Sequence, residues 1–441
     1  MSLLSRLATA GVLAWLLAHS PIATHAQNLS PREAAIRDAV ARQAADAVDF
    51  VEKTVAINSG TLNIEGVRAV GAVYREAFEA LGMETSWIYY PDSLGRAGHL
   101  VAKTRGGEGP RLLLIGHLDT VFEPSSPFQT SRREGGFLIG PGAVDMKGGN
   151  AVILYALAAL QEAGALHDAA ITVMLTGDEE DPESIEIERR ELIDEARRAD
   201  VALGFEGSVG PHHATIARRG VSEWALEVES RTGHSSQIFT DAMGYGAVFE
   251  AARILDAFRR ALSGEENLTI NPGLVVGGAE ATYDALAAAG EAEGKTNVLA
   301  ARVIVQGDLR FLTEEQKEMA RSTMRNIARQ NLPGTRATIT FREGYPAMSP
   351  TEGNQRLFRL FDTTSRDLGH GGIQPIDPGL RGAADISFAS TYTDALSGLG
   401  PMGSGSHAVG ERLDIASLEI ATIRAAVFIY RLTRPGGYPT R

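Results

Sequence analysis

The sequence has 441 residues, more than one hydrophobic core usually organises, and its hydrophobic and charged fractions of 44% and 22% are typical of a globular protein. A formal net charge of −13 argues against nucleic acid or anionic membrane as a partner, because both need a basic face. The chain has no cysteine, so disulfides and thiolate metal ligands are excluded, and any metal must be held by His, Asp and Glu.

The first 26 residues have the layout of a secretory signal peptide. Arg6 comes before an uncharged run at 7–18, and a stretch of small residues ends at Ala26. The run is too short to span a bilayer. We therefore expect cleavage after Ala26, a periplasmic or secreted location, and no membrane span in the mature protein.

The mature chain then alternates helices and strands. Ser30, Pro31 and Glu33 form a capping box that begins a long helix reaching about Ile57. The alternation predicts an α/β domain with a mostly parallel sheet that is covered by helices. The spacing of apolar residues predicts helices at 66–81, 147–163 and 184–198 and strands at 84–90, 98–104, 111–115, 171–176 and 201–205.

A different order of elements follows. Between 218 and 343 the sequence predicts strand, helix, strand, strand, helix and strand, which is the βαββαβ order of a ferredoxin-like α+β domain. The first pattern resumes with a helix at 354–368, a strand near 385–390 and a final helix at 414–432. We therefore expect a discontinuous α/β domain, 28–217 and 344–434, that carries an inserted domain at 218–343.

Acidic and histidine side chains gather in five short motifs beside these elements. The motifs are GHLDTV (116–121), GPGAVDMKGG (140–149), TGDEED (176–181), GFEGS (204–208) and GSGSHAVGERLD (403–414). Ligands of open α/β sheets collect at the carboxyl ends of the strands, where three of these motifs lie. The motifs offer nitrogen and oxygen donors for two divalent cations from His117, Asp119, Asp145, Glu179, Glu180, Glu206 and His407.

The five motifs occur in the order seen in M20 metallopeptidases, and the chain resembles that family from about Val55 (VAINSGTLNIEG) to its last helix. The family includes glutamate carboxypeptidase, acetylornithine deacetylase, succinyl-diaminopimelate desuccinylase and aminoacylase-1. The resemblance implies a zinc-exopeptidase-like catalytic domain and two Zn²⁺ per subunit, with Co²⁺ or Mn²⁺ as substitutes. It also implies that the inserted domain serves as a lid and joins two copies into a homodimer.

Five positions resemble the family's metal ligands, with Asp145 in the place of the carboxylate that bridges both ions. The others, by the same resemblance, are His117 and Glu206 for one ion and Glu180 and His407 for the other. Asp200 is an acidic alternative to Glu206, and a structural histidine is the alternative interpretation of His407.

Two further acids resemble groups that act beside the metals. Asp119 resembles the carboxylate that orients the imidazole of His117. Glu179 resembles the general base that takes a proton from the attacking water and returns it to the leaving amine. Taken alone, TGDEED also fits a solvated acidic turn.

Other motifs resemble the family's substrate contacts. His234, in RTGHSSQ (231–237), resembles a histidine that stabilises the tetrahedral oxyanion from the partner subunit, although an exposed loop histidine is the alternative. Asn297 and Arg310 resemble residues that bind the substrate carboxylate, with a salt bridge on the sheet surface as the alternative for Arg310. Arg381, in GLRGAAD (379–385), departs from the usual glycines and adds a positive charge.

The segment DPESIEIERR (181–190) also departs from the family pattern and predicts a charged helical face.

The resemblance implies a dinuclear zinc hydrolase that cleaves an amide bond next to a free carboxylate, with a small peptide as substrate. An N-acyl-amino-acid deacylase is the alternative within the family. Two alternatives lie outside the family: a non-catalytic periplasmic binding protein, and an aminopeptidase with a similar core. The inserted domain argues against the aminopeptidase.

Overall fold

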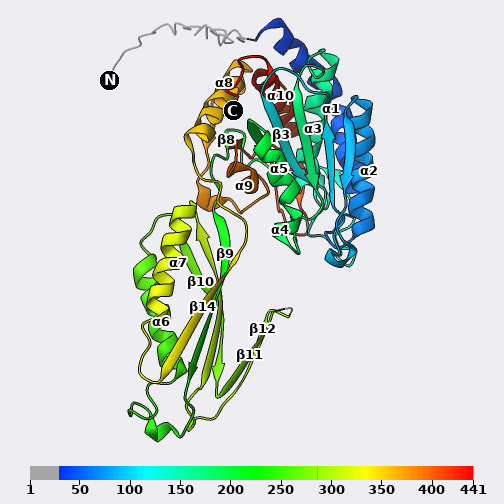
Figure 1. Cartoon of the computed structure of the whole chain (residues 1–441). Helices are drawn as coiled ribbons and strands as arrows, with labels where there is room; N and C mark the ends of the chain where they lie inside the picture. Colours follow the sequence, from blue (N-terminus) through cyan, green and yellow to red (C-terminus); the bar gives the residue numbers. More distant parts are fainter. Residues whose placement is uncertain (1–28, 286, 441) are drawn as a thin grey trace, which may run out of the picture.

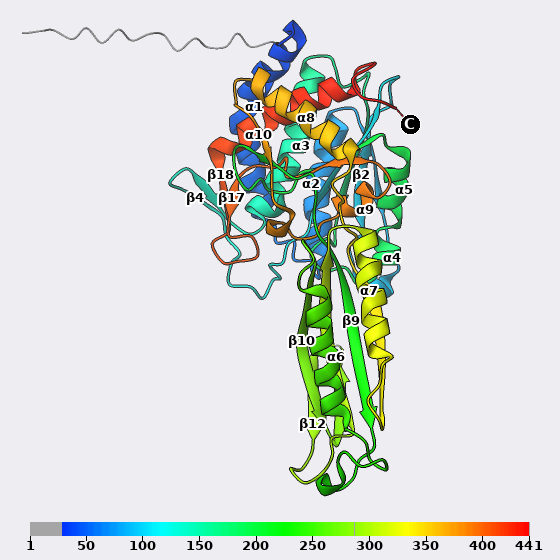
Figure 2. The same ribbon diagram turned by 90° about the vertical axis from the view of Figure 1, so that its left-hand side faces the viewer.

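The computed structural model describes residues 29–285 and 287–440, so the predicted signal peptide lies outside the described residues. The chain forms two bodies, and the second is an elongated unit that extends away from the first (Figures 1 and 2). Two adjacent segments join them, and their pairing is marked by reciprocal backbone hydrogen bonds between Arg218 and Met348 at 2.9 and 3.0 Å.

The first body is built on a six-stranded sheet in the order β1-β2-β6-β3-β7-β16. Strands β6, β3, β7 and β16 are parallel, and β1 and β2 continue the sheet in antiparallel fashion. The strands are β1 (Glu84–Ile88), β2 (His99–Lys103), β3 (Arg111–His117), β6 (Ala170–Thr176), β7 (Val201–Gly204) and β16 (Asp394–Leu396).

Helices cover both faces of this sheet, which explains why its central strands are continuous apolar runs. In β3, Leu112 and Leu114 enter one hydrophobic cluster, whereas Leu113 and Ile115 enter a second cluster on the other face. The first cluster includes α1 (Pro31–Val55), α2 (Ile64–Ala80), α3 (Gly148–Glu162), α8 (Glu352–Asp367) and α10 (Ile415–Thr433). The second includes α5 (Arg190–Arg198) and α9 (Ile386–Ser390), with α4 (Ile185–Glu188) packed beside it.

The second body has the predicted βαββαβ order. Its antiparallel sheet, ordered β10-β13-β9-β14, packs helices α6 and α7 against one face, where Trp224, Leu226 and Val228 of β9 point into a shared core. The elements are β9 (Gly220–Ser230), α6 (Ala247–Leu262), β10 (Thr269–Gly278), β13 (Arg302–Phe311), α7 (Glu314–Ala328) and β14 (Thr335–Glu343). The predicted fold class, an α/β domain with a mostly parallel sheet and an inserted α+β domain, is confirmed.

Two local predictions were wrong. The segment 385–390 is helix α9 rather than a strand, and the edge of the sheet is formed instead by β16. Tertiary contacts override the strand-like sequence here, because the buried carboxylate of Asp385 is held by Arg189 and Thr176 at the start of the helix. The predicted helix 184–198 is two helices, α4 and α5, which meet at Arg189.

Several short elements were not predicted. A hairpin of β11 (Glu280–Asp284) and β12 (Ala289–Glu293) lies between β10 and β13 in sequence. The remaining elements are β4 (Arg132–Glu134), β5 (Phe137–Ile139), β8 (His213–Ala214), β15 (Gln374–Pro375), β17 (Gly403–Ser404), β18 (Arg412–Asp414), η1 (Asp92–Leu94), η2 (Ala143–Lys147), η3 (Ser235–Gln237) and η4 (Pro378–Leu380).

Candidate active site

The site lies at the carboxyl ends of three neighbouring parallel strands. His117 is the last residue of β3, the central strand of the three. Strand β6 on one side leads to Glu179 and Glu180, and β7 on the other side leads to Glu206. The order of the strands therefore places an imidazole between two sets of carboxylates.

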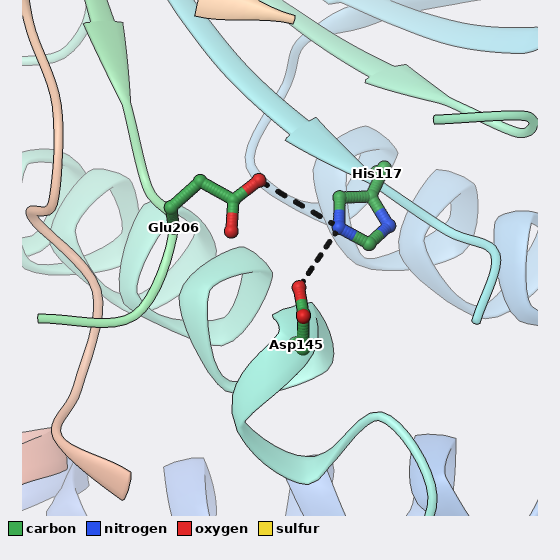
Figure 3. Close-up of side chains that lie close together, drawn as sticks. All are labelled: His117, Asp145 and Glu206. Carbon is green, nitrogen blue, oxygen red and sulfur yellow. Dashed lines mark hydrogen bonds and ion pairs between the residues drawn. The ribbon is translucent and has the colours of Figure 1, made fainter. Parts of the chain in front are cut away.

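Asp145 stands between two groups of donors and directs one carboxylate oxygen to each. Its Oδ1 is 3.3 Å from Nε2 of His117, which is 3.8 Å from Oε1 of Glu206 (Figure 3). Its Oδ2 is 3.2 Å from Nε2 of His407, which is 3.0 Å from Oε2 of Glu180. This is the arrangement that a carboxylate bridging two cations requires.

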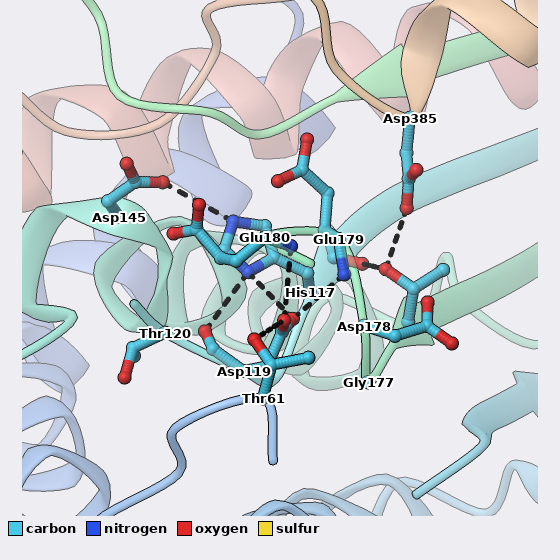
Figure 4. A network of polar contacts seen from close by, with 12 residues as sticks. Thr61, His117, Asp119, Thr120, Asp145, Gly177, Asp178, Glu179, Glu180 and Asp385 are labelled. Carbon is cyan, nitrogen blue, oxygen red and sulfur yellow. Dashed lines mark hydrogen bonds and ion pairs between the residues drawn. The ribbon is translucent and has the colours of Figure 1, made fainter. Parts of the chain in front are cut away.

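Asp119 orients both His117 and the acidic loop (Figure 4). Nδ1 of His117 lies 3.1 Å from the carbonyl oxygen and 3.3 Å from Oδ1 of Asp119, so its Nε2 faces Asp145. The same buried carboxylate accepts the backbone N–H groups of Glu179 and Glu180, each at 3.1 Å, and the hydroxyl of Thr61 at 2.7 Å. Thr61 belongs to the early segment that carries the family resemblance.

Sequence reasoning missed Glu411, which holds the loop that carries Asp145. The buried carboxylate of Glu411 accepts N–H groups from Gly142, Val144 and Asp145 at 3.2, 2.8 and 3.0 Å. The signal was present in the motif GSGSHAVGERLD, where only His407 was assigned a role. Neither a helix nor a strand pattern could show that Glu411 reaches the loop at 142–145.

His407 is not a satisfied core histidine. Its side chain is 58% exposed, and its backbone is left-handed at φ 63°, a conformation that non-glycine residues rarely adopt. Asp200, the alternative to Glu206, lies at the opposite end of the sheet, where its carboxylate contacts Arg111 at 3.0 and 3.1 Å. Of these two acids, only Glu206 lies with the other donors.

The electrostatics of the cluster suit cations. Burial raises the pKa of Glu179, and Glu206 and Asp385 raise it further, while His117 opposes them. Burial and neighbouring carboxylates also raise the pKa values of Glu180 and Glu206. Carboxylates that repel one another in a partly buried site gain from divalent cations, and the donors form groups whose ligand atoms lie within 4.8 Å. The residues present therefore fit two metal ions held by nitrogen and oxygen.

A cavity of about 260 Å³ is lined both by the acids and by two arginines, Arg218 and Arg381. Arg218 is buried, and its guanidinium donates to the carbonyl of Gly382 at 3.0 Å and to the hydroxyl of Ser397 at 3.2 Å. Burial and the charge of Arg381 lower the pKa of Arg218 to about 10. Carboxylates and guanidinium groups thus surround one cavity. Arg218, like Glu411, was not predicted from the sequence.

Three residues that were predicted to contact the substrate, His234, Asn297 and Arg310, lie away from the proposed metal ligands of the same chain. His234 caps the N-terminus of η3, beyond the end of β9, and the backbone carbonyl of Asn297 accepts the N–H of Ser235 at 2.9 Å. Strand β9 starts beside the site and continues for ten further residues, a length of roughly 33 Å. Arg310 lies at the near end of the same sheet, but its Nε donates to Asp308 at 2.7 Å. The structure therefore groups His234 with Asn297, and not with the proposed metal ligands.

The chain has relatives among known proteins. Residues 113–430 match the family described as Peptidase family M20/M25/M40. Carboxypeptidase G2 from Pseudomonas sp. (strain RS-16) is 28% identical over 394 residues, which cover 87% of this chain and 89% of that protein. Succinyl-diaminopimelate desuccinylase from Gluconacetobacter diazotrophicus is 26% identical over 384 residues, which cover 82% and 91%. The crystal structure of a tripeptidase from Staphylococcus aureus has the same fold, with a TM-score of 0.68, 20% identity, and coverage of 89% of this chain and 99% of that one.

Proposed function

Because the chain belongs to peptidase family M20/M25/M40, whose members hydrolyse amide bonds, we propose that it is a dinuclear zinc-dependent exopeptidase of the carboxypeptidase type. The substrate in this proposal is a small peptide, cleaved at an amide next to a free carboxylate. The observation that carries the proposal is that Arg218 and Arg381 line the same cavity as Glu179 and four of the proposed metal ligands.

His117, Glu206 and Asp145 would hold one cation, and Asp145, Glu180 and His407 would hold the other. When bound, such cations supply Lewis acidity to the scissile carbonyl and to the attacking water. Glu179 takes the proton of that water and delivers it to the leaving nitrogen. Glu179 is suited to both steps by its place in the cavity, which it lines together with four of the proposed metal ligands.

The two arginines supply the preference for a free carboxylate. Guanidinium groups bind carboxylates through charge-assisted hydrogen bonds, and a partly enclosed cavity strengthens the attraction. Arg218 is already held by Gly382 and Ser397, so little side-chain freedom is lost when a substrate binds. Fixing the carboxylate fixes the position of the adjacent amide relative to Glu179.

The test compares two substrates that differ only in the carboxylate. The protein loaded with Zn²⁺ is given a panel of dipeptides and N-acyl amino acids and the C-terminal amide of each. We expect hydrolysis of the free acids and a rate at least about a hundredfold lower for the amides, because the sites that bind the carboxylate are left unpaired. Equal rates for both forms would reject the carboxypeptidase assignment.

The same panel tests the alternative, an N-acyl-amino-acid deacylase. The similarity to succinyl-diaminopimelate desuccinylase favours this second function. Faster hydrolysis of N-acyl amino acids than of dipeptides would identify a deacylase that uses the same residues.

Assembly and location belong to the proposal as well. A homodimer formed through the inserted domain would let one subunit supply His234 and Asn297 to the site of the other. An exposed aromatic cluster of Phe239, Tyr245 and Phe249, with ring centroids 5.2 and 5.5 Å apart, lies in the same part of that domain and supports a contact there. A signal peptide ending at Ala26 would direct the enzyme to the periplasm or out of the cell.

A further inference from the structure

The main chain of Glu179 is held by a tyrosine that has no place in the proposed chemistry. The phenol of Tyr345 donates a hydrogen bond to the carbonyl oxygen of Glu179 at 2.9 Å. It accepts one from Nη2 of Arg189 at 3.1 Å. With the amide of Glu179 bound by Asp119, both the N–H and the C=O of this residue are fixed by side chains.

Arg189 makes the tyrosine a rigid support. Its side chain is fully buried, and it donates to Asp385 at 2.6 Å and to the carboxylate and carbonyl of Asp178 at 2.5 and 3.0 Å. Asp178 is the residue immediately before Glu179. Arg189 comes from the segment predicted to be a charged surface, yet it crosses the interior to hold the acidic loop.

Tyr345 also lies where the chain returns from the second body to the first. The second body, β9 to β14, is the domain predicted to serve as a lid, and it is called the lid domain below. Tyr345 follows β14 by two positions, and its carbonyl accepts the N–H of Val221 at the start of β9 at 2.8 Å. Its ring packs on Phe388 in the second hydrophobic cluster of the sheet, with centroids 4.9 Å apart. Two residues later, Ala347 belongs to the core of the lid domain. The position of the phenol therefore depends on how the lid domain is joined.

We propose that Tyr345 is a positioning residue that links the joint of the lid domain to Glu179. Through its phenol it sets where the main chain of the general base lies, so that the base is aligned only when the joint is correctly formed. The inference rests on the proposed function for the role of Glu179, but the contact itself does not.

The first test replaces Tyr345 with phenylalanine, which removes one oxygen and keeps the ring. We expect kcat to fall about tenfold, the effect of losing one hydrogen bond that aligns the base, and KM to change less than about twofold. Hydrogen exchange in residues 176–181 should become faster, because the loop loses a support. Zinc content should stay at the wild-type value.

Tyr392→Phe is the matched control. Tyr392 packs against the same cluster and also contacts an arginine, with its phenol 3.4 Å from Arg197, but that pair does not reach the acidic loop. This variant should match the wild type in kcat and in exchange of 176–181. Equal effects of the two substitutions, or wild-type behaviour of Tyr345→Phe, would overturn the proposal.

A second substitution tests the link to the joint. A Cβ added at Gly344 would lie 2.6 Å from the carbonyl oxygen of Val221, so Gly344→Ala disturbs the joint beside Tyr345. We expect this change to speed exchange in 176–181 when Tyr345 is present and to add little in the Tyr345→Phe protein. Additive effects would show that the joint does not act through the phenol. The exchange measurements need no substrate, so they judge this inference even if the proposed activity is not found.

Discussion

Asp145 is the residue on which both halves of the proposed metal site depend. Its two carboxylate oxygens face different groups, one toward His117 and the other toward His407. Glu206 belongs to the group around His117 and Asp145 and not to the group around His407. Removing Asp145 and removing Glu206 should therefore have different effects on the zinc content of the protein.

Asp145→Ala should abolish binding of both zinc ions, because each ion loses a shared ligand, whereas Glu206→Ala should lower the content of one. Metal analysis of the purified proteins after dialysis measures this directly. If Asp145→Ala retains one equivalent of zinc, Asp145 does not bridge the ions.

Arg381 is the residue that should tune the preference for a carboxylate. Arg381→Ala removes one charge from the cavity, so KM for the best free-acid substrate should rise about tenfold or more, while the slow reaction of the matching amide should not change. Steady-state kinetics on the pair distinguish this effect from a general loss of activity, which would lower both rates equally.

Among the elements of the site, the loop at 142–145 donates three of its backbone N–H groups to one side chain, Glu411. Glu411→Ala leaves three buried N–H groups without their acceptor, each at a cost of about 1 kcal/mol or more. The variant should melt at a lower temperature and bind zinc more weakly than the wild type. Glu411→Gln keeps one acceptor oxygen, so its melting temperature and zinc affinity should lie between those of Glu411→Ala and the wild type. Wild-type zinc affinity in both variants would contradict this role of Glu411.

The sequence predicted those parts of the site that follow from the ends of strands. His117, Glu179 and Glu206 sit at the ends of apolar runs, and parallel pairing brings such ends together. Arg189 and Tyr345 could not be found in this way, because their roles depend on contacts that join distant segments through the interior. The segment 385–390 was assigned as a strand for the same reason, since its helix is fixed by contacts rather than by local preference.

The stability of the whole molecule should depend on pH through a half-buried histidine, His370. Burial and the charge of Arg424 lower the pKa of His370 to about 4, below its ordinary value of 6.5. Between these values the unfolded chain binds a proton that the folded chain does not, so stability falls as pH falls from 6.5 toward 4. His370→Gln should make the denaturation midpoint less dependent on pH in this window, and an unchanged slope would contradict the prediction.

The separation of His234 from its own site predicts complementation between subunits. If His234 acts in the partner's site, mixing inactive His234→Ala and Glu179→Ala proteins should restore activity. Random exchange makes half of the dimers hybrid with one complete site each, so about a quarter of the wild-type rate is expected. A chain carrying both substitutions, mixed with either single variant in the same way, is the control and should stay inactive. No recovery after verified exchange of subunits would show that His234 does not act in trans.

The role of Glu179 as general base is tested by the turnover of Glu179→Ala on the best free-acid substrate, with its zinc content and melting temperature determined on the same sample. We expect two zinc ions, an intact fold and a kcat lower by about a thousandfold or more, because the proton carrier is lost while its surroundings remain. Near-normal turnover with both ions bound would contradict the assignment of Glu179 as the general base.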